Sequence, residues 1–166
     1  MNRRIFFHPE RCMLCLSCVL ACQMNSVGTS EIRKIPQDRE PTARLAPVLS
    51  RGTPWVWTCR HCTSAPCVEA CVSGSLRQEE GKARVIHQPE TCVGCGSCNL
   101  VCPYGALKFD SIEGRVSKCN LCAGEEVPPC VKVCEARALV CQEPDLFARE
   151  KKKRYAREMR SHRGIE

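Results

Sequence analysis

Sixteen of the chain's seventeen cysteines fall into four groups of four with short, repeated spacings. Cysteine thiolates are ligands for soft metal centres, including zinc, copper(I) and iron–sulfur clusters. Groups one and three share the spacing C-x2-C-x2-C-x3-C, whereas groups two and four open with C-x2-C and close with Pro-Cys-Val-x-x-Cys. In chain order the groups are Cys12, Cys15, Cys18 and Cys22; Cys59, Cys62, Cys67 and Cys71; Cys92, Cys95, Cys98 and Cys102; and Cys119, Cys122, Cys130 and Cys134.

The spacing of groups one and three is typical of cubane [4Fe–4S] clusters. A cubane needs four converging thiolates, and the fourth cysteine of such a run, often followed by proline, binds the other cluster of a pair. Cys102 is followed by Pro103, whereas the last cysteines of the other three groups lack that proline, a departure that removes no ligand. The sixteen cysteines therefore predict four [4Fe–4S] clusters, with iron as the metal.

Structural zinc is the main alternative, and it would make the chain a metal-held structural or interaction module without a redox role. Zinc usually takes four ligands from two C-x2-C pairs, which does not explain two copies of C-x2-C-x2-C-x3-C. An enzyme with a substrate-binding cluster is a third hypothesis, but it needs an open iron site, and sixteen cysteines for four clusters leave none. Iron and sulfide content, with electron paramagnetic resonance (EPR) after reduction, separates these hypotheses.

Short elements must position these cysteines. Arg3 to Phe7 predicts a first strand, and two segments predict hairpins that turn at Glu-Gly pairs: Leu76 to His87, and Ala106 to Ser117. Short helices are expected to follow the third cysteine of each group. The chain alternates two group types, so it resembles a duplicated pair.

Composition agrees with a fold held by metal. Apolar residues make up 43% of the chain with the cysteines included, and aromatic residues only 5%, which is a thin core for 166 residues. The twin Arg3-Arg4 is not followed by the apolar stretch of an export signal, because His8 and Pro9 come next. No run is long enough for a membrane span. A reduced, cytoplasmic setting is favoured, where thiols are more often metal ligands than disulfides.

Two phrases carry a family resemblance. The stretch from Cys59-Arg-His-Cys62 through Pro66-Cys-Val-Glu-Ala-Cys71, together with Lys118-Cys-Asn-Leu-Cys122, is similar to the four-cluster ferredoxin-like electron-transfer subunits. Such subunits serve dimethyl sulfoxide reductase, formate dehydrogenase, hydrogenase, carbon monoxide dehydrogenase and tungsten aldehyde oxidoreductases. The resemblance covers residues 5–140.

The resemblance implies a ligand assignment that spacing leaves open, since group three could pair with group two or group four. Groups one and four pair, groups two and three pair, and three cysteines of one group join the last cysteine of its partner. The implied sets are Cys12, Cys15, Cys18 and Cys134 (cluster 1); Cys22, Cys119, Cys122 and Cys130 (cluster 2); Cys59, Cys62, Cys67 and Cys102 (cluster 3); and Cys71, Cys92, Cys95 and Cys98 (cluster 4).

The expected fold is α+β, with two bacterial-ferredoxin-like (βαββαβ-type) modules and small antiparallel hairpins around the four clusters. The expected divisions are 1–22 with 103–141 as one module, 59–102 as the other, an irregular insert over 23–58, and a basic tail over 142–166 that is helical from about Asp145. Four prolines in the insert support its irregular assignment.

The expected function is an electron relay between a catalytic redox subunit and another carrier. The sequence shows no substrate pocket, nucleotide loop or acid–base set, so no catalytic residues are assigned and the chain is expected to be non-catalytic. The expected partners are a catalytic subunit of the carbon monoxide dehydrogenase, molybdenum or tungsten enzyme, or hydrogenase type, and a second electron carrier or flavoprotein. No motif supports nucleic acid binding, and no transmembrane segment is expected.

Charge singles out the tail. The formal net charge is +7, and residues 149–163 contain eight Lys or Arg against two Glu. Each loaded cluster with its thiolates adds about −2, so the body becomes acidic while the tail stays basic. The tail is either a solvated helix or a docking element for an acidic partner surface.

Two other residues need an interpretation. Cys141 belongs to no group and is expected to be a buried, small apolar residue. His61 lies inside a ligand run, and with four cysteines present it is interpreted as a loop residue that makes hydrogen bonds.

Overall fold

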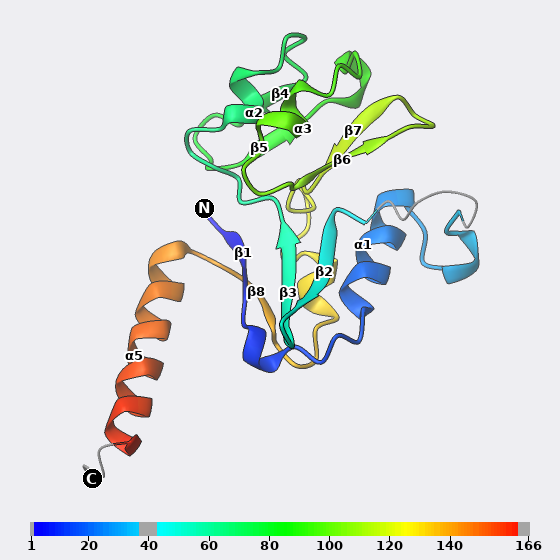
Figure 1. The fold of residues 1–166 in the computed structure, drawn as a ribbon. Coiled ribbons are helices and arrows are strands. Elements are labelled where there is room, and N and C mark those ends of the chain that lie inside the picture. Colours follow the sequence, from blue (N-terminus) through cyan, green and yellow to red (C-terminus); the bar gives the residue numbers. More distant parts are fainter. Residues whose placement is uncertain (1, 37–42, 163–166) are drawn as a thin grey trace.

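The computed structural model describes residues 2–36 and 43–162, in which all strands pair as two-stranded antiparallel sheets (Figure 1). The pairs are β1 (Arg4–Phe7) with β8 (Leu139–Gln142), β2 (Leu45–Ser50) with β3 (Thr53–Thr58), β4 (Leu76–Gln78) with β5 (Val85–His87), and β6 (Leu107–Asp110) with β7 (Arg115–Lys118). The first strand and both predicted hairpins are thus confirmed.

Helices are short except at two places. They are α1 (Ser17–Val27), α2 (Pro66–Glu69), α3 (Ser97–Val101), α4 (Pro129–Lys132) and α5 (Pro144–His162), with 3-10 turns η1 (Pro9–Arg11), η2 (Ile32–Lys34) and η3 (Pro89–Thr91). Each of α1 to α4 begins one residue before the third cysteine of its group, so this cysteine is always in a first turn. Proline opens α2 and α4, where its missing N–H costs nothing. The predicted tail helix is confirmed as α5.

The predicted irregular insert over 23–58 is wrong for much of its length. Helix α1 continues to Val27 and ends at Gly28, which takes the left-handed conformation, and β2 and β3 form a hairpin. Pro47 lies opposite Val56, and Pro54 lies opposite Leu49. Both strands are edges of a two-stranded sheet, so each proline can sit where no ladder N–H is needed.

This unexpected hairpin is the counterpart of β6–β7. Leu45 pairs with Thr58, and Cys59 follows; Leu107 pairs with Lys118, and Cys119 follows. The duplication therefore includes the hairpins as well as the cysteine groups, and the segment with no counterpart is confined to the part that precedes β2.

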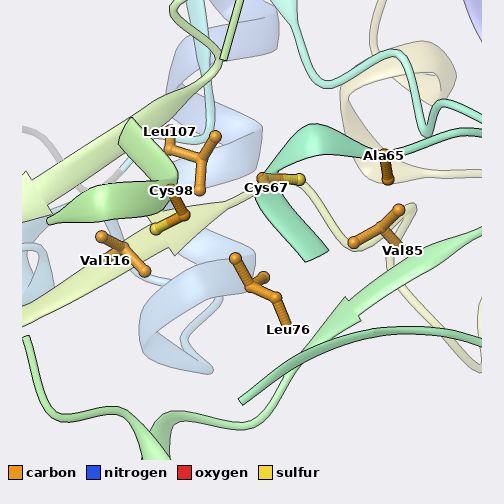
Figure 2. Packing of buried hydrophobic residues seen from close by; sticks show 7 residues of the cluster. All are labelled: Ala65, Cys67, Leu76, Val85, Cys98, Leu107 and Val116. Atoms are coloured by element: carbon orange, nitrogen blue, oxygen red, sulfur yellow. The ribbon is translucent and has the colours of Figure 1, made fainter. Parts of the chain in front are cut away.

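Two small hydrophobic cores include the cysteines themselves. One contains the buried residues of Figure 2: Ala65, Cys67, Leu76, Val85, Cys98, Leu107 and Val116. The other centres on Leu45, Cys130 and Leu139. In Figure 1 the elements of the first core, β4 to β7 with α2 and α3, lie in one lobe, and β1, β8, β2, β3 and α1 lie in the other.

The predicted boundary after residue 102 does not match this packing. It assigned the β6–β7 hairpin to the module of groups one and four, but Leu107 and Val116 pack in the core of groups two and three. The β2–β3 hairpin contributes Leu45 and Val56 to the other core. Each core therefore contains residues of one of the two equivalent hairpins, β6–β7 in one core and β2–β3 in the other. No helix in the described part of the chain is long and apolar enough to span a membrane.

Candidate iron–sulfur cluster sites

The first set of cysteines lines one cavity. Cys12, Cys15, Cys18 and Cys134, here quartet 1, surround a space of about 260 Å³. The remaining wall is apolar and includes Phe7 and Val56. Helices α1 and α4, which carry cysteines of groups one and four, pack against each other. Residues more than a hundred positions apart are thereby brought to one site.

A second, narrower cavity is lined by Cys22, Cys119, Cys122 and Cys130, here quartet 2. Burial raises the pKa of the Cys130 thiol well above its usual value, and the nearby thiols of Cys119 and Cys22 raise it further. Burial likewise raises the pKa of Cys122 to about 11. These thiols lie close enough to repel one another once ionised, so a bound cation is needed to hold them together as thiolates.

The remaining two sets are identified by the same mutual effects. Burial raises the pKa of Cys67 to about 11, and Cys59, Cys102 and Cys62 raise it further; these four are quartet 3. Burial raises the pKa of Cys98, and Cys71, Cys92 and Cys95 add to the shift; these four are quartet 4. Helices α2 and α3, which carry members of both quartets, are in contact.

Exposure differs sharply between the quartets. Cys15 in quartet 1 and Cys95 in quartet 4 are exposed, whereas the other quartet cysteines are buried or partly buried. Hydrogen bonds to Ser17 and Ser97 lower the pKa of Cys15 and Cys95, respectively. Cys15 and Cys95 are each the second cysteine of a C-x2-C-x2-C-x3-C group, and one lies in each lobe.

Left-handed backbone turns aim the cysteines inward. The turn residues Leu14, Leu16, His61 and Leu121 have φ between 48° and 62°, and Gly94 and Gly96 have φ of 66° and 72°. A left-handed residue between two cysteines reverses the chain, so that neighbouring side chains point to one centre. The strain of a side chain there, about 1 to 2 kcal/mol at each of the four non-glycine positions, must be offset elsewhere. Bound clusters provide such compensation.

Backbone N–H groups donate to the sulfur of the last cysteine in every group. The donors are Arg44 to Cys22 (3.2 Å), Leu76 to Cys71 (3.3 Å), Ala106 to Cys102 (3.5 Å) and Leu139 to Cys134 (3.4 Å). In groups two and four the first cysteine also accepts, from His61 to Cys59 and from Leu121 to Cys119, each at 3.4 Å. Such bonds stabilise thiolate charge and tune iron–sulfur clusters. Sequence reasoning could not find the Arg44 donor, because Arg44 acts across 21 intervening residues.

Two buried polar residues lie beside the quartets. His61 is fully buried, and its Nδ1 accepts a hydrogen bond from the N–H of Val85 (3.2 Å), as expected for a hydrogen-bonding loop residue. Burial and the nearby charge of Lys118 lower the pKa of His61 to about 3, which keeps the ring neutral. Lys118, 2% exposed, was not singled out by its sequence position. Cys141 is partly exposed on β8, which corrects its expected burial.

The donor chemistry fits iron–sulfur clusters. In the described residues no group of three or more His, Cys, Asp or Glu is drawn tightly around a point for a single metal ion. Quartets 1 and 2 are instead spread around cavities, and thiolates bound to the separate corners of a cubane must lie further apart than the ligands of one ion. All-thiolate sets with N–H donors to sulfur are the environment that such clusters require.

Comparison with known proteins agrees with this geometry. The family described as 4Fe-4S dicluster domain matches residues 53–144, more than half of the chain. The chain belongs to this family. An iron-sulfur protein of Rhodospirillum rubrum is 34% identical over 98% of this chain and 94% of its own length.

Two other relatives have functional names. The thiosulfate reductase electron transfer subunit PhsB of Salmonella typhi is 34% identical over 83% of this chain and 74% of its own. The electron transport protein HydN of Escherichia coli K12 is 28% identical over 85% and 88%, respectively. The predicted resemblance to [4Fe–4S] ferredoxin-like electron-transfer subunits is thereby confirmed.

Proposed function

We propose that this dicluster-family chain relays single electrons through a row of four [4Fe–4S] clusters, between a catalytic redox subunit and another carrier. The observation that carries the proposal is the set of four cysteine quartets, with an exposed cysteine only in quartets 1 and 4. Relatives named as electron transport or transfer proteins support the same function.

The proposed ligand sets are the four quartets, in agreement with the assignment that the family resemblance implies. Each cluster, when bound, supplies a site that accepts and returns one electron. The chain's own residues hold these sites with thiolates, bury them and donate N–H groups to sulfur. No bond to a substrate is made or broken in such a relay, so no catalytic side chain is assigned.

Neighbouring thiols support the order 1–2–3–4. Cys18 of quartet 1 acts on the pKa of Cys130 in quartet 2, and Cys119 of quartet 2 acts on that of Cys59 in quartet 3. Quartets 3 and 4 contribute cysteines to one core. An electron would therefore enter near Cys15 or Cys95 and leave near the other.

The proposed partners are a catalytic oxidoreductase subunit of the carbon monoxide dehydrogenase, molybdenum or tungsten, or hydrogenase type, and a second carrier such as a flavoprotein. Helix α5 is proposed to face an acidic surface of one of them, because Arg149, Lys151–Lys153, Arg157 and Arg160 are all exposed. Removing residues 145–166 should weaken co-purification of the partner most at low salt, and the difference from the full chain should shrink as salt screens the tail's charges. Equal retention of the partner at all salt concentrations would reject this role for the tail.

Metal analysis and reductive titration test the relay. We expect about sixteen iron atoms and as many sulfides per chain, and four one-electron reduction steps followed by EPR. Replacing Cys98 by Ser should remove or alter one step, whereas Cys141→Ser should leave all four, because Cys141 is in no quartet. A colourless zinc protein, or clusters that no reductant within the biological range reduces, would favour the structural-module alternative instead.

A further inference from the structure

Lys118 is a buried cation at the junction of the two lobes. Its side chain is 2% exposed, and Nζ donates hydrogen bonds to the carbonyl oxygens of Val85 and Cys119, both at 2.6 Å. Val85 is on β5 and Cys119 opens group four, so the two acceptors come from different parts of the chain. Because both acceptors are neutral, the hydrogen bonds hold the ammonium group in place without cancelling its charge.

The thiols nearest this charge belong to two different quartets. Burial lowers the pKa of Lys118, whereas the nearby thiolates of Cys59 and Cys67 of quartet 3 and of Cys119 of quartet 2 favour its charged form. Cys59 in turn lies near Cys119. The ammonium group therefore lies where the two inner quartets of the proposed row approach each other. His61 is also buried beside this site, and its Nδ1 accepts a hydrogen bond from the N–H of the same Val85.

The duplicated plan shows that this lysine is not required by the local fold. Thr58 is the equivalent residue: it pairs with Leu45 as Lys118 pairs with Leu107, and it precedes Cys59 as Lys118 precedes Cys119. The hydroxyl oxygen of Thr58 is buried and has no hydrogen-bond partner. One half of the repeat thus forms the hairpin and the cysteine turn without a cation, and the lysine in the other half needs a different explanation.

We propose that Lys118 is a fixed positive charge that raises the reduction potentials of the two inner clusters of the relay. This inference rests on the proposed function, because it assumes clusters in quartets 2 and 3. A positive charge favours the more negative, reduced form of a nearby cluster, and a buried charge is weakly screened by solvent. Electrons would then be held preferentially at the middle of the row.

The effect should be larger at quartet 3 than at quartet 2. Arg44 and Lys108 also act on Cys22 of quartet 2, so part of the positive field remains there when Lys118 is changed. Lys118 is the cation that acts on both Cys59 and Cys67 of quartet 3. Loss of the lysine charge should therefore lower the reduction potential of the quartet 3 cluster more than that of the quartet 2 cluster.

Three variants test this in the intact, cluster-loaded protein. Lys118→Gln removes the charge but keeps an N–H donor, Lys118→Arg keeps the charge, and Lys34→Gln makes the same net change at an exposed lysine. Iron and sulfide content is measured first, followed by a redox titration monitored by EPR. We expect Lys118→Gln to shift two of four reduction steps to lower potential, one more than the other, while Lys118→Arg and Lys34→Gln stay at the wild-type values.

The outcomes are separable. Four unshifted steps in Lys118→Gln, or an equal shift of all four in Lys34→Gln, would overturn the inference and leave the relay intact. If Lys118→Gln loads no iron, Lys118→Thr replaces it, since the chain uses threonine at the equivalent position. Iron loss from both neutral variants, with full loading of Lys118→Arg, would assign a folding role and overturn the tuning role. Wild-type protein without four clusters would instead reject the proposed function.

Discussion

At the scale of single residues, the two C-x2-C-x2-C loops solve the same backbone problem with different residues. Group one uses Leu14 and Leu16 at left-handed positions where group three uses Gly94 and Gly96. Leucine pays the strain of this conformation, whereas glycine does not. The choice of glycine at position 94 has a second cause, because a Cβ there would overlap the carbonyl oxygen of Gly114 in the β6–β7 turn.

The two glycines of group three are therefore expected to differ on substitution. Gly96→Ala meets no atom within 4 Å and should cost only the backbone strain, about 1 to 2 kcal/mol of unfolding free energy. Gly94→Ala adds a clash with backbone that cannot rotate away, and the total should reach about 2 to 5 kcal/mol. Denaturant unfolding of the two loaded variants gives the comparison. Equal losses would show that the turn at Gly114 gives way freely.

At the scale of elements, the sequence predicts well the short elements that lie next to the cysteine groups. The spacing of the groups, the hairpins that turn at Glu80-Gly81 and Glu113-Gly114, and the strand before Cys12 are local patterns with strong signals. The β2–β3 hairpin was missed because Pro47 and Pro54 resemble breakers. Their effect depends on which edge of the strand faces a partner, and that is decided by tertiary structure.

Helix α5 is held to the body through its first turns and its middle. The ring of Phe147 stacks on Phe6 with centroids 4.1 Å apart, and Arg154 contacts the carboxylate of Glu10 and Nδ1 of His8. Burial lowers the pKa of His8 below 6.5, and the charges of Arg11 and Arg154 act in the same direction against the opposing effect of Glu10. Neutral His8 is thus the form that suits the docked helix.

The attachment of α5 should consequently weaken in acid. Because the pKa of His8 is lower in the folded state, its contribution to stability is complete above pH 6.5 and is lost as the pH falls through the folded pKa. Amide hydrogen exchange of α5, corrected for intrinsic rates, should become faster as the pH falls. A His8 pKa that docking lowers by about one unit corresponds to an increase of at most about tenfold. His8→Gln removes the titration, and α5 should then show no such step. A step that persists in His8→Gln would point to Glu10 instead.

At the scale of the whole molecule, the sequence leaves the partner of group three open, and a contact between distant segments supports its pairing with group two. Spacing fits both neighbours of group three because both gaps are short. Cys134 lines the same cavity as Cys12, Cys15 and Cys18, and β1 (Arg4–Phe7) pairs with β8 (Leu139–Gln142) beside it. Only chain closure over more than a hundred residues gives this arrangement, and no local pattern encodes it.

The same arrangement makes folding depend on the clusters. Cysteines are buried members of both cores, with Cys67 and Cys98 in one and Cys130 in the other, and few large apolar side chains accompany them. Without metal, burial raises the pKa of these thiols, so the cores would enclose neutral sulfhydryls around empty space. Binding energy at such sites is folding energy.

Removal of iron should therefore abolish cooperative unfolding in both lobes at once. We expect a chelator-treated, thiol-reduced protein to lose its sharp thermal transition by circular dichroism and to regain it when iron and sulfide are restored. Helix α5 needs no cysteine, so residual helical signal should remain, and the matched comparison is a chain shortened before residue 145. An iron-free protein that still melts cooperatively would show that hydrophobic packing alone supports these cores, contrary to the small number of large side chains that they bury.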